Sequence, residues 1–213
     1  MPHEPDVVDE ALAAWVPSPL STGFEIEDAR LDETADLTGA VAPAGRFARC
    51  RLAGVRLAGT RLRSLRLIDV VITDADLSNA DWTGAQLQRA VLERCRMTGF
   101  GGASLQGEHV TLRACKLDLA NLRGAELRGV SFEDCVLDDA DLGGAALREV
   151  RFAGCRLRGT LIDELRLTRV DFRGSQLEPE GDIAALRGAI IDSVQLMELG
   201  PLLSRSLGID VRD

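Results

Sequence analysis

Residues 115–159 read, in groups of five, CKLDL ANLRG AELRG VSFED CVLDD ADLGG AALRE VRFAG CRLRG. The third residue of every group is Leu or Phe, and the first is Ala, Val or Cys. A period of five matches neither the 3.6-residue period of an α-helix nor the two-residue period of a strand. The stretch therefore predicts a repeat architecture, in which each unit packs mainly against its neighbours.

The same pattern extends in both directions, from Leu37 to Leu177. Large apolar residues occupy 26 of the 29 third positions in this range, and the first positions are mostly Ala, Val or Cys. All five cysteines of the protein fall at first positions. These two positions of each pentapeptide are expected to face the interior, and the other three to face solvent or form turns.

The pattern changes around residue 100. Gly102 and Gly107 occupy third positions, whereas Phe100 and Leu105 occupy first positions. One interpretation is a size swap between the two inward positions, which conserves core volume. The other is a register slip that a small bulge near 106–109 corrects, since the flanking registers agree again at residue 112.

A longer period of 20 residues overlies the period of five. Phe132, Phe152 and Phe172 are 20 residues apart, and so are the last four cysteines. Four pentapeptides therefore form one coil, and identical side chains stack on each other in successive coils.

Several pentapeptides match the pattern A-[D/N]-L-x-x, including Ala35–Gly39, Ala75–Asn79, Ala120–Gly124 and Ala140–Gly144. The sequence therefore resembles the pentapeptide-repeat family over residues 35–179. The resemblance implies an all-β solenoid, a right-handed quadrilateral β-helix of about seven to eight coils with short helices at the termini.

We divide the chain into three parts: an N-terminal capping segment (1–23), the β-helix (24–192, with its core at 35–179) and C-terminal helices (193–213). Within the capping segment, residues 6–16 place Val8, Ala11, Leu12 and Trp15 on one helical stripe. We expect a short helix there, beginning at Asp6 and covering the open edge of the first coil.

Two short helices are predicted in the C-terminal part, over 194–199 and 201–207, because Gly200 is suited to end the first and Pro201 to occupy the first turn of the second. These two helices carry more apolar residues than a cap on the last coil would need to bury. The gyrase-targeting branch of the family dimerises through such helices, so the resemblance implies a homodimer, although a monomeric cap is equally compatible with the sequence. The expected dimerisation residues are Leu196, Leu199, Leu202, Leu203 and Leu207.

No residue pattern favours an enzyme, a metal site or a cofactor. The cysteines lack the close pairs of zinc sites, and the only two histidines are His3 and His109. The net charge of −9 argues against direct nucleic-acid binding. No apolar run is long enough to cross a membrane, and no secretion signal is evident, so a cytoplasmic location is expected.

The charge distribution bears on the partner. Residues 1–34 carry nine acids and one Arg, whereas residues 35–179 carry 21 basic and 19 acidic side chains. Qnr- and MfpA-like relatives mimic duplex DNA, bind DNA gyrase and protect this topoisomerase from fluoroquinolones, so the resemblance implies such a protein partner. The alternative is an interaction scaffold with another partner, whose surface charges pair between coils. The candidate partner-binding residues are Asp74, Asp76, Asp118, Glu133, Asp134, Asp138, Asp139 and Asp141.

Overall fold

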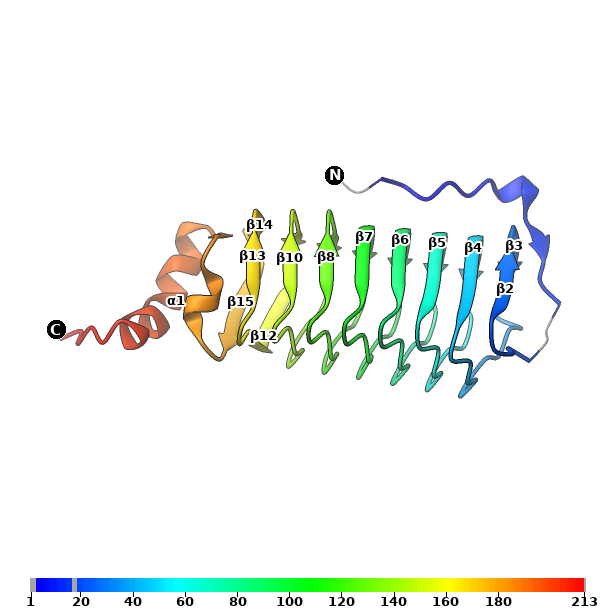
Figure 1. Ribbon diagram of the computed structural model, residues 1–213. Coiled ribbons are helices and arrows are strands. Elements are labelled where there is room, and N and C mark those ends of the chain that lie inside the picture. The colour runs from blue at the N-terminus through cyan, green and yellow to red at the C-terminus, as the bar shows by residue number, and fades with distance from the viewer. Residues whose placement is uncertain (1–2, 17–18, 213) are drawn as a thin grey trace.

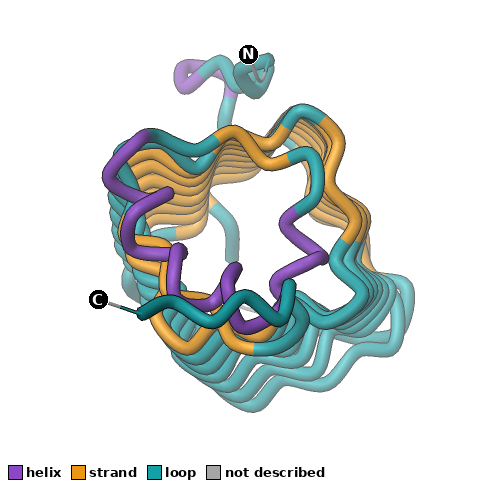
Figure 2. The backbone as a smooth tube through the Cα atoms, turned by 90° about the vertical axis from the view of Figure 1, so that its left-hand side faces the viewer, coloured by secondary structure: helices purple, strands orange, loops and turns teal. Residues whose placement is uncertain are grey.

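The computed structural model describes residues 3–16 and 19–212. The chain winds into a parallel β-solenoid of stacked coils (Figure 1), and the coils enclose a four-sided interior when viewed along the axis (Figure 2). The predicted quadrilateral β-helix is therefore confirmed. The stack has about nine turns, slightly more than the repeats alone predict, because partial turns are added at both ends.

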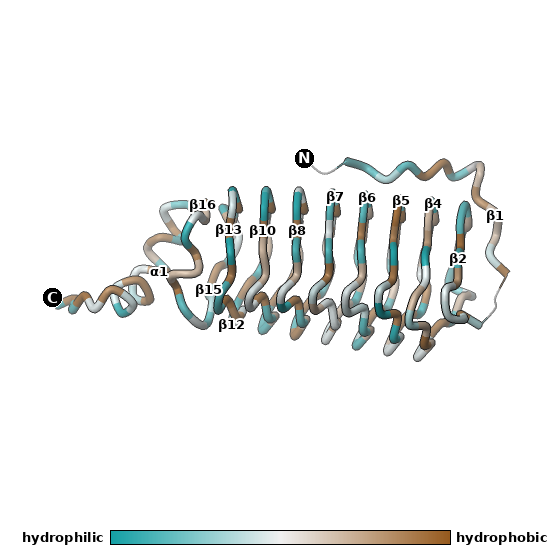
Figure 3. The backbone as a smooth tube through the Cα atoms, in the orientation of Figure 1, coloured by the Kyte–Doolittle hydropathy of each residue, from teal (hydrophilic) through white to brown (hydrophobic). Residues whose placement is uncertain are grey.

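Parallel strands from successive coils form the walls, and each coil pairs with the coil 20 residues later. Leu67 lies between Phe47 and Leu87, and Phe152 pairs with Phe132. Hydrophobic and hydrophilic residues alternate along the walls (Figure 3). The strands are β1 (Ala13–Ala14), β2 (Phe24–Glu27), β3 (Ala29–Leu31), β4 (Gly45–Ala53), β5 (Leu65–Thr73), β6 (Gln86–Glu93), β7 (Gln106–Arg113), β8 (Glu126–Arg128), β9 (Ser131–Glu133), β10 (Ala146–Arg148), β11 (Arg151–Ala153), β12 (Arg156–Leu161), β13 (Arg166–Thr168), β14 (Val170–Asp171), β15 (Gln176–Glu180) and β16 (Ala189–Ile190).

The core consists of the first and third residues of the pentapeptides, as the sequence predicts. The rings of Phe132, Phe152 and Phe172 stack almost parallel, with centroids 4.7 and 4.8 Å apart. This distance equals the spacing between neighbouring strands, so each ring lies directly on the ring of the next coil.

The coils keep their register through the irregular region around residue 100. Gly107 pairs with Leu87 on one side and Leu127 on the other. Phe100 and Leu105 are buried at 2% and 6% exposure, so these large side chains point inward beside the two glycines. The size swap is therefore the correct interpretation, and the register slip is not.

The first coil is out of phase with the others by one residue. Phe24 pairs with Gly45 and Arg30 with Arg51, a step of 21 residues. A Cβ atom on Gly45 would lie 2.0 Å from the ring of Phe24, so this position requires glycine. The phenylalanine occupies the space that a side chain at residue 45 would otherwise fill.

The predicted helix over residues 6–16 is wrong. The segment is extended and contains a single 3-10 turn, η1 (Asp9–Ala11), followed by β1. A helix of this length is marginal in water, whereas the extended chain pairs with the solenoid: the amides of Ala13 and Trp15 donate to the carbonyls of Asp28 and Arg30, each at 2.9 Å. From β1 the segment runs back along the outside of the coils (Figures 1 and 2).

The C-terminal end carries one helix rather than two. After the 3-10 turn η2 (Ile183–Leu186), α1 spans Ser193–Ser206 and continues through Pro201. Asp192 caps α1 in a capping box with Gln195, and the Gln195 Nε2 donates to the carbonyls of Phe172 and Ser175. The helix is thus anchored on the last coil, which explains why it tolerates an internal proline. No helix among the described residues is long and apolar enough to cross a membrane.

Candidate partner-binding surfaces

The cysteine column lies in the core. The Sγ of Cys115 is 3.4 Å from the carbonyl oxygens of Leu92 and Arg113, to which the thiol donates. Burial raises the pKa of the Cys50 thiol, so this group remains protonated near neutrality. Among the described residues, no group of three or more His, Cys, Asp or Glu side chains is arranged to hold a metal ion. The cysteines therefore act as small packing residues.

The candidate acidic residues do not form one continuous stripe, because arginines from adjacent coils neutralise several of them. The Nε atoms of Arg94 and Arg113 lie 2.7 Å from the carboxylates of Asp74 and Glu133. Arg94 lowers the pKa of Asp74, and Arg113 lowers the pKa of Glu133.

Two further candidate partner-binding residues, Asp138 and Asp141, also form ion pairs with arginines. Asp138 contacts Arg156 at 2.7 Å, and its side chain is only 21% exposed. Asp141 contacts Arg123 at 3.2 Å. Asp76 instead accepts hydrogen bonds from the amide and hydroxyl of Ser78. These three carboxylates are therefore engaged in local contacts.

Three candidates retain carboxylates without an ion pair among the described residues: Asp118, Asp134 and Asp139. Asp134 and Asp139 occupy coil corners with φ of +53° and +54°, a conformation that Asp adopts more readily than most residues. The Asp139 carboxylate lies over Gly159 of the next coil, where a Cβ atom would be 2.4 Å from its Oδ1. Asp118 accepts a hydrogen bond from Thr98 and lies one coil before Asp138. We call Asp118, Asp134 and Asp139 the acidic edge.

The expected dimerisation residues divide into two groups. Leu199 is buried, and Leu202 and Leu203 pack partly against the core. Leu196 and Leu207 are 53% and 72% exposed. Further exposed apolar residues lie on α1 and in the chain that follows it: Val194, Met197, Ile209 and Val211.

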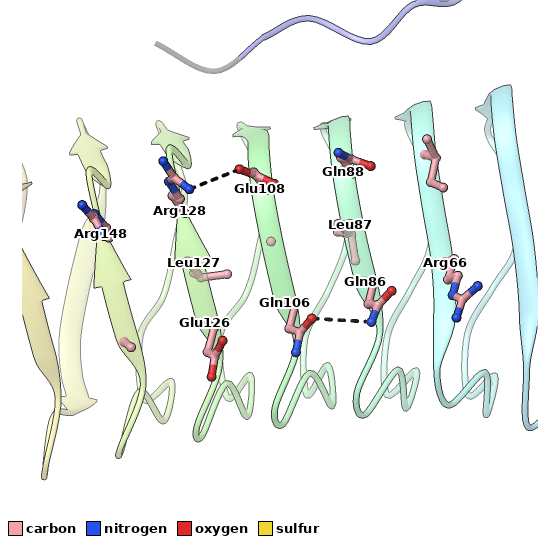
Figure 4. Close-up of a pocket in the computed structure, with 13 residues that line it drawn as sticks. Arg66, Gln86, Leu87, Gln88, Gln106, Glu108, Glu126, Leu127, Arg128 and Arg148 are labelled. Atoms are coloured by element: carbon pink, nitrogen blue, oxygen red, sulfur yellow. Dashed lines mark hydrogen bonds and ion pairs between the residues drawn. The ribbon is translucent and has the colours of Figure 1, made fainter.

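A shallow depression on one wall was not anticipated from the sequence. It lies where Gly107 replaces a large inward residue, between Leu87 and Leu127 (Figure 4). Among its lining residues, Gln106 accepts a 3.5 Å hydrogen bond from Gln86, and Arg128 lies 3.7 Å from Glu108. Gly107 is one of the lining residues, and its place at a third position is the part of this depression that the sequence shows.

Comparison with protein families identifies the repeat. The model described as pentapeptide repeats (8 copies) matches residues 66–107, and the model described as pentapeptide repeat region matches residues 107–179. The chain is a pentapeptide-repeat protein. Together the two matches cover more than half of its length, and a search of curated proteins returned no significant match.

Solved structures of other pentapeptide-repeat proteins are similar. A trypsin-treated variant of QnrB1, described as a plasmid-mediated fluoroquinolone resistance protein, is 22% identical, with 90% of this chain and 99% of that chain covered and a TM-score of 0.46. Full-length QnrB1 is 19% identical, with 89% and 100% covered and a TM-score of 0.39. HetL from Nostoc sp. strain PCC 7120, described as involved in heterocyst differentiation regulation, is 21% identical, with 81% and 91% covered and a TM-score of 0.34.

Proposed function

We propose that this pentapeptide-repeat protein is a non-enzymatic rod that binds another protein through its outward side chains. The observation that carries the proposal is the acidic edge. Asp118, Asp134 and Asp139 retain carboxylates without an ion pair among the described residues, whereas neighbouring acids are neutralised by arginines. Charges that the fold leaves unpaired are available to a basic partner.

The partner that we propose first is DNA gyrase, bound in place of DNA, with protection of the enzyme from fluoroquinolones as the consequence. Carboxylates on successive coils are spaced by about 4.8 Å along the axis, whereas duplex DNA presents one charge per about 1.7 Å. The acidic edge offers only three carboxylates, Asp134 and Asp139 on two corners of one coil and Asp118 on the coil before it, so it is a sparser array than DNA. It would serve as a local contact, and the mimicry would not extend over the whole rod.

An interaction scaffold for a different protein is the second candidate, and the ion pairs between coils favour it. Arg56 contacts Asp36 at 3.1 Å, and Arg63 contacts Asp81 at 3.0 Å. Opposite charges thus alternate along the walls, which gives patches rather than a single negative surface. A partner with matching patches would fit this pattern as well as gyrase does.

A supercoiling assay with purified gyrase, with and without a fluoroquinolone, distinguishes these candidates. We expect the parent protein to alter supercoiling or relieve drug inhibition, and the Asp134→Lys/Asp139→Lys double variant to lose the effect. Asp134 and Asp139 are preferred to Asp138, because Asp138 is held by Arg156. Arginine already occupies equivalent corner positions at Arg89 and Arg94, so lysine is compatible with the backbone.

Glu126→Lys/Glu164→Lys is the matched control, since both glutamates are exposed and lie away from the acidic edge. It changes the net charge by the same amount and should behave like the parent. A parent protein with no effect on gyrase would contradict the topoisomerase proposal and leave the scaffold proposal.

We further propose that the protein forms a homodimer through the exposed apolar residues of α1 and the chain that follows it. Leu196 and Met197 are 53% and 71% exposed on the helix. Apolar residues gathered at one end of a molecule are typical of an interface. Residues such as Leu199, which the last coil buries, would support the helix and would not contact a second copy.

A further inference from the structure

The N-terminal segment, residues 3–12, lies along the outside of the coils and is held at three points. The carboxylate of Asp9 contacts Arg51 at 2.7 Å, and the amide of Asp6 donates to the Asp69 Oδ1 at 3.1 Å. The ring of His3 meets that of His109 edge-on, with centroids 4.6 Å apart. These three points belong to successively later coils, so the segment follows the axis of the rod (Figure 1).

The surface below the segment has an unusual composition for an outer wall. Val71 and Val91 are half-buried at an outward position that Arg51 and Arg151 occupy in other coils. At the adjacent corner, Asp69 is bound by Arg89 at 2.6 Å and its side chain is only 9% exposed. We call Arg51, Asp69, Val71, Arg89, Val91 and His109 the outer track.

The outer track also contains an unsatisfied polar atom. The Nδ1 of His109 is buried without a hydrogen-bond partner among the described residues. Buried polar atoms usually have partners, so an unpaired one indicates an incompletely filled contact. The N-terminal segment thus covers this surface but leaves the His109 Nδ1 without a hydrogen bond.

The segment is attached weakly. Among residues 3–11, the Asp6 amide is the only described backbone group that hydrogen-bonds to the coils. Pro5 and Val7 are half-buried, whereas Glu4, Asp6 and Val8 are exposed, so alternate side chains face the wall. A segment with so few buried contacts opens at low cost in free energy.

We propose that the outer track is a docking site for an extended acidic segment of a partner protein, and that the N-terminal segment is a tethered occupant which this partner displaces. The occupant defines the chemistry of the ligand. An acidic side chain binds Arg51, a backbone amide donates to Asp69, and the small apolar side chains of Pro5 and Val7 are half-buried at alternate positions of the segment.

A peptide suits this track better than a nucleic acid does. Two valines and the Asp69 carboxylate lie between Arg51 and His109, and a run of phosphates would face that carboxylate. The site lies apart from the acidic edge, since Asp69 and Asp139 occupy different corners of the coil. A negative result for the docking proposal therefore does not affect the gyrase proposal, and a negative result for the gyrase proposal does not affect the docking proposal.

Binding of a fluorescein-labelled synthetic peptide with the sequence of residues 3–16 to the full chain tests this proposal by anisotropy. The native segment competes at an effective concentration in the millimolar range, because it is tethered to the track. Asp9→Arg repels Arg51 and should release the segment. We expect this variant to bind the peptide at least about tenfold more tightly than the parent does.

The charge swap Asp9→Arg/Arg51→Glu restores the internal pair and repels the acidic peptide, so it should bind no better than the parent. Glu164→Arg adds the same charge at a distant corner and should match the parent. Hydrogen exchange of residues 4–11 should accelerate in Asp9→Arg and return towards the parent rate in the swap.

Three results would overturn the proposal. The first is equal peptide affinity in Asp9→Arg and the parent, whether or not exchange accelerates. The second is equally tight binding of a scrambled peptide of the same composition, which would show unspecific charge attraction. The third is preferential binding of a duplex oligonucleotide by Asp9→Arg, which would assign the track to nucleic acid.

Discussion

At the scale of single residues, the first position of most pentapeptides holds a small side chain, because it points into a narrow interior; the exceptions include Phe100 and Leu105, which lie beside glycines at third positions. Cys115 is fully buried, and its neighbours in the column are Cys95 and Cys135. Ala, Val and Cys differ little in the space they need, whereas a charged side chain would find neither water nor a counter-ion there.

Substitutions at Cys115 test this requirement. Cys115→Ala removes one buried sulfur atom and should cost about 1 kcal/mol of unfolding free energy. Cys115→Arg buries an unpaired charge and should cost several kcal/mol, about 4 or more, so that the middle coils unfold. Thermal unfolding followed by circular dichroism compares the two, and equal melting temperatures would contradict the inward assignment.

At the scale of one coil, inward positions exchange volume with each other. Leu105 fills space beside Gly107, where a Cβ atom would lie 2.9 Å from the Leu127 side chain. A cavity of about 40 Å³, lined by residues such as Trp82 and Leu105, remains between these coils. The core of this coil therefore has the usual side chains in an inverted order.

The inverted order predicts non-additive substitutions. Leu105→Ala should destabilise the protein by about 2–4 kcal/mol by enlarging the cavity. Gly107→Leu alone should also destabilise it, since the new side chain meets Leu127. The double variant restores the usual order, so its loss should be smaller than the sum of the two. Chemical denaturation of all four proteins measures this coupling, and simple additivity would show that the two positions do not share one space.

Much of this architecture follows from the sequence, because the period of five fixes which side chains face inward. The first coil departs from this period by one residue, as its 21-residue register shows. The sequence-based prediction fails for residues 6–16, where the apolar spacing suits a helix but Ala13 and Ala14 pair with β3 as an extended strand. It also fails at Pro201, since contacts between α1 and the last coil support a continuous helix.

The candidate site was less predictable than the fold. The sequence identifies acids that share a corner or a wall, but neutralisation depends on which arginine reaches them from the next coil. Asp138 and Asp139 are adjacent in sequence, yet only Asp138 has an arginine partner among the described residues. The outer track could not be predicted from the sequence either, because it depends on where the N-terminal segment lies.

At the scale of the whole molecule, carboxylates held by arginines and hydroxyls make the stability depend on pH. Contacts with Thr38, and with Arg56, lower the pKa of Asp36 from 3.8 to about 2. Arg89 likewise lowers the pKa of Asp69, and Arg94 that of Asp74. These groups bind protons more readily in the unfolded chain than in the folded one.

Acidification should therefore destabilise the fold. The stabilisation is complete above the unfolded pKa of about 4 and is lost as the pH falls through the folded values towards about 2. Melting temperatures measured from about pH 5 to about pH 2 should decrease over this window. Arg94→Gln removes the partner of Asp74, so the melting temperature of this variant should decrease less over the same pH range. A parent protein with the same melting temperature at about pH 2 as at about pH 5 would contradict the role of these pairs.

The exposed apolar end predicts the oligomeric state. Leu196→Asp/Met197→Asp places two charges on the outward side of α1 and should convert a dimer to a monomer in analytical ultracentrifugation. The buried Leu199 is left intact, so the helix should stay on the last coil and circular dichroism should not change. Leu119→Asp is a control that adds one charge at an exposed apolar residue away from α1, because Leu119 is 61% exposed at a corner of the solenoid with φ of +59°, a conformation that Asp accepts. A parent protein that remains monomeric at about 100 μM, well above a typical micromolar dissociation constant, would leave the apolar end of α1 without a role in self-association.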